Sequence, residues 1–254
     1  MIVIPRSHRG TVLILGATSS IARHTAAAFA RRGYDLCLAA RDRDELQRLG
    51  SDLLLRHGVN TQTVQFDATD PGSSQKMMDV VMDEAFGDLS GVVLCFGTLG
   101  AQEEAQDNAQ VTRDIIGVTF TAAAGLLTPL ANYFEERGRG FIATISSVAG
   151  DRGRQSNYVY GSAKGGLSVF LQGLRQRLAK SGVSVTTIKP GFVDTRMTFG
   201  LPGMFLVADP VAVGEGIARA IEKRKSVAYI PGFWRWIMLI IKLIPEKIFV
   251  RLKL

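Results

Sequence analysis

One serine, one tyrosine and one lysine are spaced for acid–base chemistry on a carbonyl group. Tyr160 and Lys164 lie four residues apart, so on a helix they share one face. Ser147 precedes Tyr160 by thirteen residues and directly follows an apolar run typical of a buried strand. A phenol has an ordinary pKa of about 10, and a neighbouring ammonium is expected to lower that pKa and so favour proton transfer. These side chains predict ketone reduction, with Tyr160 as acid and Ser147 orienting the carbonyl; the alternative is a Tyr160 hydroxyl that faces water.

A glycine turn near the N-terminus has the residue types that hold a dinucleotide phosphate. Gly16 follows an apolar run, and a helical pattern begins within the residues after it: Thr18, Ser19, Ser20 and Ile21. A strand, a tight turn of small residues and a helix N-terminus direct backbone N–H groups at a pyrophosphate. Ser20 and Ala22 replace the second and third glycines of the usual fingerprint, and both are small enough for close backbone approach. The turn predicts nucleotide binding, with a plain surface turn as the alternative.

The end of the second apolar run indicates which dinucleotide is preferred. Ala40 stands where a carboxylate would bind the ribose 2′-hydroxyl of NAD, and Arg41 follows it. A guanidinium forms charge-assisted hydrogen bonds with a 2′-phosphate, so we expect NADP(H) as the cofactor. Asp42 beside Arg41 would weaken the positive field. The alternative is a solvated arginine at the start of a helix.

Alternating strands and helices must position these residues. The apolar runs predict strands at 11–15, 35–39, 63–66, 92–95, 141–145, 183–188 and 227–230. Most are continuously apolar, which is typical of strands buried on both faces. Helices are expected over 21–32, 42–57, 73–86, a long segment within 110–137, 158–181 and 210–223. The alternation predicts one doubly wound α/β (Rossmann) domain with about seven parallel strands and helices on both faces, and a mobile substrate loop near 197–207.

Composition and charge exclude several other classes of protein. Of the 254 residues, 46% are apolar and 21% charged, which excludes wholesale disorder. Cys37 and Cys95 lie in apolar runs and are expected to be buried, and the three histidines show no ligand spacing, so no metal is expected. Much of the +7 charge gathers in an apolar tail without a nucleic-acid motif, so nucleic-acid binding is disfavoured. No signal peptide or run of about 18 apolar residues is found, and a cytoplasmic location is expected.

From Thr11 to Ile230 the chain resembles the short-chain dehydrogenase/reductase family. The resemblance rests on the Gly16 turn, Ser147, Tyr160 with Lys164, and further motif positions: Asp67, Gly97 and residues 190–195. It implies that Ser147, Tyr160 and Lys164 are catalytic, that Asp67 contacts adenine, and that 190–195 line the nicotinamide. Beyond the turn and Arg41, the cofactor contacts that it implies are Asp67, Ala68, Gly97, Tyr160, Lys164, Pro190, Gly191, Val193 and Thr195. Family members are commonly homodimers or homotetramers, formed through the helices at Gln110 and Tyr158.

Two positions depart from the family pattern. Leu94, Cys95 and Phe96 precede Gly97 in place of the usual Asn-Asn-Ala, and Thr119 stands where many members carry an asparagine of a proton relay. A threonine can still hold a water, so the relay is expected to differ. The alternative to an enzyme is a non-catalytic nucleotide-binding sensor or scaffold.

Several segments are most similar to one branch of this family, which reduces a 2-keto pentose carried on a polyprenyl phosphate. They are residues 96–100, 121–123, 157–167 and 195–197 and parts of the C-terminal tail. The resemblance implies a lipid-linked ketone as substrate. Another lipid ketone or a small soluble carbonyl are the alternatives.

The tail after the 1–230 domain gives an independent reason to consider lipids. We place residues 231–254 in the same domain, and 233–244 are nearly all apolar, with Trp234 and Trp236 among them. From Arg235 onward the tail holds five basic residues and one acidic residue, a net charge of +4. Aromatic, apolar and basic residues together suit an anionic membrane interface, which predicts a peripheral location on the inner face of the cell membrane. Equally, the tail could form a helix that packs on the substrate cleft or on another subunit; the two possibilities are not exclusive.

Overall fold

Seven strands pair in parallel in one sheet, in the order β3-β2-β1-β4-β5-β6-β7. The computed structural model describes residues 9–83, 89–200 and 203–252. The strands are β1 (Thr11–Leu15), β2 (Asp35–Ala40), β3 (Thr61–Gln65), β4 (Leu89–Leu94), β5 (Phe141–Ile145), β6 (Ser184–Pro190) and β7 (Val227–Ile230). The chain runs outward from β1 to β3 and then returns to β4 on the other side of β1. This reversal at the carboxyl ends of β1 and β4 is where doubly wound folds bind dinucleotides.

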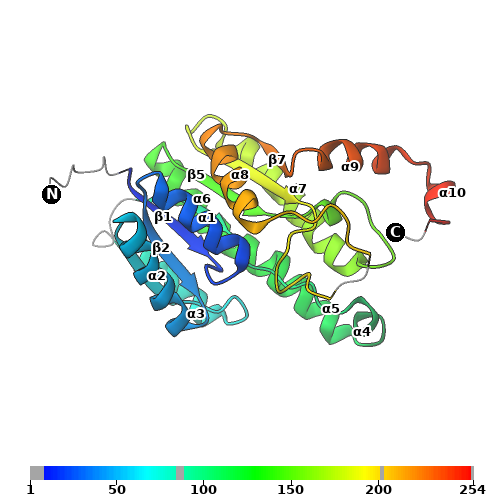
Figure 1. The fold of residues 1–254 in the computed structure, drawn as a ribbon, viewed down its shortest axis with the longest axis horizontal. Coiled ribbons are helices and arrows are strands. Elements are labelled where there is room, and N and C mark those ends of the chain that lie inside the picture. The colour runs from blue at the N-terminus through cyan, green and yellow to red at the C-terminus, as the bar shows by residue number, and fades with distance from the viewer. Residues whose placement is uncertain (1–8, 84–88, 201–202, 253–254) are drawn as a thin grey trace.

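Helices cover both faces of the sheet (Figure 1). They are α1 (Ser20–Arg31), α2 (Arg43–His57), α3 (Pro71–Met82), α4 (Gln102–Asp107), α5 (Ala109–Ile116), α6 (Ala122–Arg137), α7 (Tyr158–Leu178), α8 (Pro210–Glu222), α9 (Trp234–Leu243) and α10 (Glu246–Phe249). Val12 and Ile14 of β1 belong to the core on one face, and Leu13 and Leu15 to the core on the other. Because successive strand residues point to opposite faces, a strand covered on both sides must be apolar throughout. The predicted doubly wound fold is confirmed.

The strand boundaries differ from prediction where strand residues are not apolar. At the edge of the sheet, β3 begins at Thr61, two residues before the predicted start, because its polar residues pair with β2 while facing solvent. Similarly, β4 begins at Leu89 rather than at residue 92, since Ser90 and a glycine continue the strand without a long apolar run. At its end, β6 extends through Pro190 because β7 pairs with its last residues. Strand pairing thus extends beyond the apolar run that predicted each strand.

The segment 110–137 is not one regular helix. The α-helical turns of α5 are followed by the π-helix η2 (Gly117–Thr121) and then by α6. By length and composition, residues 109–137 are the one stretch of described helix that could cross a membrane, a test that core helices also pass. Their inner face supplies Leu127, Leu130 and Phe134 to the core beneath the sheet.

The third predicted helix, 73–86, is shifted toward the N-terminus. In the structure α3 begins at Pro71, because the Asp70 carboxylate accepts a hydrogen bond from the Gly72 N–H and proline suits the first helical position. The predicted end of this helix falls at 84–86, outside the described residues.

Candidate active site

The end of β5 and the start of α7 bring Ser147, Tyr160 and Lys164 together. Ser147 caps the short 3₁₀ helix η3 (Val148–Gly150), and its Oγ accepts the Ala149 N–H at 3.1 Å. Tyr160 lies in the first turn of α7, which packs on η3, and a hydrogen bond joins its phenol to Ser147. The three residues therefore meet at the carboxyl edge of the sheet, as expected for a catalytic group in this fold.

Lys164 is fixed beneath Tyr160 by the backbone of β5. Its Nζ donates to the Ile145 carbonyl at 2.7 Å and lies 5.7 Å from the centre of the Tyr160 ring, and the residue is only 4% exposed. A second link joins the same elements, because Ser146 Oγ donates to the Lys164 carbonyl at 3.0 Å. The strand end and the helix are thus held in one register around the lysine.

Burial controls the protonation of this pair. Burial raises the pKa of Tyr160 to about 12, although the hydrogen bond with Ser147 acts in the opposite direction. The pKa of Lys164 is lowered to about 8, also by burial. The expectation of a lowered tyrosine pKa is therefore wrong for this structure, because desolvation raises the Tyr160 pKa by more than the hydrogen bond with Ser147 lowers it. At neutral pH the site holds a protonated phenol above a largely protonated amine.

Thr119 lies beside this pair and fastens the loop after β4. Its Oγ1 donates to the Thr98 carbonyl and accepts the Thr98 N–H, both at 3.1 Å, and the residue is fully buried in η2. A side chain at Gly97 would meet Lys164 Nζ at 3.2 Å and Thr119 at 3.6 Å. Thr119 therefore supports the loop that borders the lysine, with one acceptor lone pair of its hydroxyl still free.

The Gly16 turn joins β1 to α1 at the reversal of strand order. Gly16 has a φ of +78°, and a Cβ there would lie 2.9 Å from the Phe96 backbone nitrogen, so the turn requires glycine. Its N–H and that of Ala17 both donate to the Ala39 carbonyl at the end of β2. Ser19 caps α1, and the N–H groups of Ser20 and Ile21 lie in the first helical turn, where a helix leaves its donors without partners. This cradle fits a pyrophosphate.

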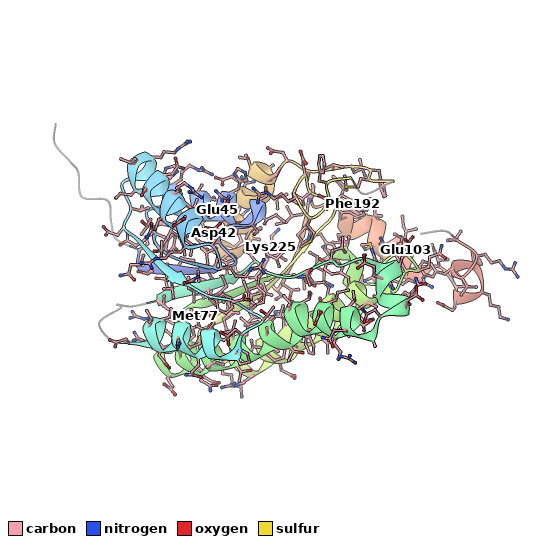
Figure 2. All side chains as sticks on the ribbon, turned by 90° about the horizontal axis from the view of Figure 1, so that it is seen from below. Asp42, Glu45, Met77, Glu103, Phe192 and Lys225 are labelled. Atoms are coloured by element: carbon pink, nitrogen blue, oxygen red, sulfur yellow. The ribbon has the colours of Figure 1, made fainter. Side chains whose placement is uncertain are left out.

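The start of α2 carries the charges that would read a 2′-phosphate. Arg41 is exposed at the end of β2, and the Asp42 carboxylate accepts the Glu45 N–H at 2.9 Å as the cap of α2. Figure 2 labels Asp42 and Glu45 close together in this region. Arg23 of α1 donates to the Thr18 carbonyl at 3.0 Å and pairs with Glu45. Asp42 is therefore engaged in capping, and a second cation that the sequence reading missed lies beside the turn.

Asp67 and Ala68 follow β3 on the same edge. The Asp67 carboxylate accepts the Thr69 N–H at 2.9 Å and the Thr69 hydroxyl at 2.8 Å, and these bonds hold its pKa below the usual value. The Asp67 N–H donates to Ser73 Oγ at 2.9 Å. The loop is thus fixed with an ionised carboxylate where the resemblance places adenine.

Comparison with known proteins identifies the family to which the chain belongs. The model of the short chain dehydrogenase family matches residues 10–202. The chain is a short-chain dehydrogenase/reductase. It is 36% identical over 241 residues to an uncharacterized oxidoreductase of Mycobacterium tuberculosis, covering 95% of this chain and 96% of the relative.

Solved structures agree with the assignment. A short-chain dehydrogenase of Sphingobium yanoikuyae in complex with NADPH has a TM-score of 0.81 at 27% identity, covering 93% of this chain and 97% of that chain. A bulky-bulky ketone specific alcohol dehydrogenase of Comamonas testosteroni has a TM-score of 0.77 at 26% identity, with 93% and 95% covered. This short-chain dehydrogenase/reductase is therefore an oxidoreductase that uses a nicotinamide dinucleotide, NAD(P)(H).

In this dehydrogenase/reductase, the segment after β6 contacts the C-terminal tail. Val193 bridges to Ala208, and the Thr195 hydroxyl shares a hydrogen bond of 3.1 Å with the Thr198 hydroxyl. A Cβ on Gly191 would lie 1.9 Å from Trp234 Nε1, so glycine is what allows the indole to lie there. Residues 201–202 of the predicted 197–207 loop lie outside the described residues. The predicted nicotinamide segment is thus covered by the first residue of α9.

A buried polar cluster behind this segment was missed from the sequence. Lys189 forms an ion pair with Asp151, whose side chain is 3% exposed against 11% for the lysine, and Tyr229 donates to the same carboxylate at 2.7 Å. Arg154 lies close by, and its NH2 group contacts Met238 Sδ at 3.3 Å. Among the described residues, Arg154 Nε and Trp234 Nε1 are buried without a hydrogen-bond partner. Only the fold brings these residues together, and none lies in a motif that would signal the cluster.

Proposed function

We propose that this enzyme reduces a ketone to an alcohol with NADPH. The observation that carries the proposal is the partly buried Tyr160 phenol, which is hydrogen-bonded to Ser147, lies over Lys164 and has a pKa raised to about 12. A phenol that stays protonated at neutral pH is a proton donor, as reduction requires. Oxidation would need the same group ionised.

Each side chain has one task in this reaction. NADPH, when bound, supplies the hydride to the carbonyl carbon. Ser147 donates a hydrogen bond that orients the carbonyl oxygen, and Tyr160 gives its proton to that oxygen. Lys164, anchored on the Ile145 carbonyl, keeps its charge below the phenol and stabilises the phenolate left after proton transfer. Its amine would also hydrogen-bond the nicotinamide ribose when the cofactor is bound.

Preference for NADPH over NADH is supported by the charges at α2. Arg41 is exposed beside the cradle, and Asp42 is turned into the cap of α2. The remaining contacts would come from the cradle residues Gly16, Thr18, Ser19, Ser20 and Ile21, from Asp67, Ala68 and Gly97, and from Pro190, Gly191, Val193 and Thr195.

A bulky, lipid-linked carbonyl is the substrate class that we propose. The chain resembles decaprenylphosphoryl-2-keto-ribose reductase, and a structural relative acts on bulky ketones. Aromatic rings gather on the proposed substrate side: the centre of the Trp234 ring lies 5.8 Å from that of Phe192 in an edge-to-face arrangement and 5.4 Å from that of Phe205 at a tilt. Arg154 supplies a cation with a free Nε–H that suits a phosphate. For such a substrate we propose a cytoplasmic enzyme at the inner face of the membrane.

The second candidate is a reductase of another lipid ketone or a small soluble carbonyl. The non-catalytic sensor or scaffold is less supported, because Thr119 engages Thr98 and leaves Ser147, Tyr160 and Lys164 assembled. Short-chain dehydrogenases are commonly oligomeric, and we propose a homodimer or homotetramer through α5 and α7.

The test follows NADPH oxidation with a polyprenyl-phosphate-linked 2-keto pentose and with the same keto sugar lacking the lipid. Rapid oxidation with the lipid-linked form alone supports the substrate class. Equal rates with both substrates would mean that the enzyme reduces the keto sugar whether or not a lipid is attached. Oxidation of neither substrate, with NADPH bound, would reject this substrate class and leave other ketones to be tried.

A further inference from the structure

Helix α9 has two apolar faces, and only one of them is covered. The inner face carries Trp234 and Met238, which are 1% and 0% exposed and pack with Val148. Partly buried Ile237 and Ile241 complete this contact. Through this face the tail packs on the body of the protein, beside the segment that follows β6.

The outer face of α9 is a continuous apolar stripe. It consists of Phe233, Trp236, Leu239, Ile240 and Leu243, all classed as exposed. Their spacing of three and four residues places them on one side of the helix. Trp236 is 62% exposed, Ile240 65% and Leu243 72%, and large apolar residues gathered in this way mark an interaction surface.

The segment after α9 also exposes apolar residues and is anchored to the body. Ile248, Val250 and Leu252 are exposed there. Arg152 donates to the carbonyls of Ile241 and Ile244, pairs with Glu246 at 2.8 Å, and its guanidinium lies 3.7 Å from the centre of the Phe249 ring. Figure 1 shows α9 and α10 projecting from the end of the molecule opposite α2 and α3. The element that presents the outer face is therefore anchored to the body through Arg152.

Exposed cations border the stripe. Arg235 and Lys242 stand seven residues apart on one side of α9, and Lys247 and Arg251 follow in the next segment. Glu246, the one acidic residue of this segment, is neutralised by Arg152. Each cation close to an anionic lipid surface is attracted to it, and salt screens this attraction. The border thus has the opposite charge to an anionic bilayer.

We propose that the outer face of α9 and α10 docks on an anionic bilayer, with the stripe in the acyl boundary and the four cations at the headgroups. A second copy of the chain is a poorer occupant, because a two-fold contact would place the same cations against one another. The inner face of α9 contacts Phe192, so the docked surface adjoins the proposed substrate side. The proposal does not depend on which ketone is reduced.

The test measures co-sedimentation of the full-length protein with two kinds of vesicle, pure phosphatidylcholine and phosphatidylcholine mixed with phosphatidylglycerol. We expect binding to the mixed vesicles at least about tenfold tighter than to neutral ones, weakened by salt, with a blue shift of tryptophan fluorescence. The double variant Trp236→Ser, Ile240→Ser should lose at least about tenfold in affinity. Leu55→Ser on α2, a leucine 85% exposed, is the matched control and should bind as the parent does.

Charge-reversal variants and a measurement of the oligomeric state distinguish the remaining outcomes. Reversing Arg235→Glu and Lys242→Glu should abolish the preference for anionic vesicles. Equal binding to both vesicles, or none to either, would overturn the proposal. A parent dimer that the double variant splits, seen by light scattering, would instead make this face a contact between copies. Unchanged NADPH affinity and melting temperature show that each variant is folded, so these outcomes do not depend on the proposed reaction.

Discussion

The two ends of the carboxyl edge are built from different kinds of contact. At the dinucleotide end, the Gly16 turn, Arg23 and Arg41 come from one stretch of chain, and the ion pair of Arg23 with Glu45 is partly solvent-exposed. At the proposed substrate end, Asp151, Lys189 and Trp234 come from segments far apart in sequence, and their side chains are buried. A cofactor common to many enzymes can be held by a local motif, whereas a particular substrate side requires packing between distant segments. The polar groups of the substrate end should therefore govern stability, and those of the dinucleotide end cofactor choice.

Tyr160 lies between the two ends, and the variant Tyr160→Phe should show the largest loss of turnover. Removing the phenolic hydroxyl deletes the proton donor and should lower turnover by roughly 10³-fold, within the range for a general acid. NADPH affinity, measured by fluorescence titration, should change less than about twofold, since the ring remains. Loss of NADPH binding together with activity would mean that the variant is misfolded, and turnover near that of the parent would remove Tyr160 from the mechanism.

Asp151→Asn should destabilise the fold strongly. The change leaves the Lys189 ammonium buried without its counter-charge, which costs about 3–5 kcal/mol of unfolding free energy. The exposed pair of Arg56 and Asp52 on α2 is the control, and Asp52→Asn should cost no more than about 0.5 kcal/mol. Urea denaturation of both variants measures the difference. Equal losses would contradict the proposed contrast between the ends.

Arg41→Ala should alter cofactor choice without altering stability. Loss of the guanidinium removes a charge-assisted contact and should weaken NADPH binding by about 10- to 100-fold, with NADH nearly unaffected. Titration of both cofactors against the parent and the variant gives the ratio. An unchanged ratio of NADPH to NADH affinity would show that Arg41 does not bind the 2′-phosphate, and would leave Arg23 or Arg43 as its partner.

Ketone reduction should slow as pH rises through about 8. Burial lowers the pKa of Lys164 to about 8, so the ammonium is present below that pH and lost above it, whereas Tyr160 stays protonated until about 12. The single-turnover rate should therefore fall about tenfold per pH unit above 8. The unfolding free energy should change with pH in the opposite direction to the rate. Between pH 8 and the ordinary lysine pKa the unfolded chain binds more protons at this site than the folded chain does, so the unfolding free energy rises with pH. A rate independent of pH from 7 to 10 would show that the charge of Lys164 is not needed.

Arg154→Gln should have the smallest effect of these variants. It should change the binding of the substrate, whereas Arg41→Ala should change the binding of the cofactor. For a phosphate-bearing ketone, KM should rise by about tenfold at most with turnover little changed, because the guanidinium binds a part of the substrate remote from the carbonyl. A neutral ketone should show no change, nor should NADPH affinity. A rise in KM for both ketones would indicate that Arg154 shapes the site through Met238 and not through charge.

The sequence alone was enough to predict the doubly wound fold and to identify the catalytic candidates. Strands buried on both faces must be apolar throughout, and Tyr160 and Lys164 share a helix face at fixed spacing, so short-range patterns carry both signals. Only the tertiary structure shows the burial that raises the pKa of Tyr160, the use of Asp42 as a cap, and the meeting of Asp151, Lys189 and Tyr229. It also divides the tail into a covered face and an exposed one, which hydrophobicity along the chain cannot distinguish. Desolvation and contacts between distant segments depend on the three-dimensional surroundings of a residue, and local sequence does not encode them.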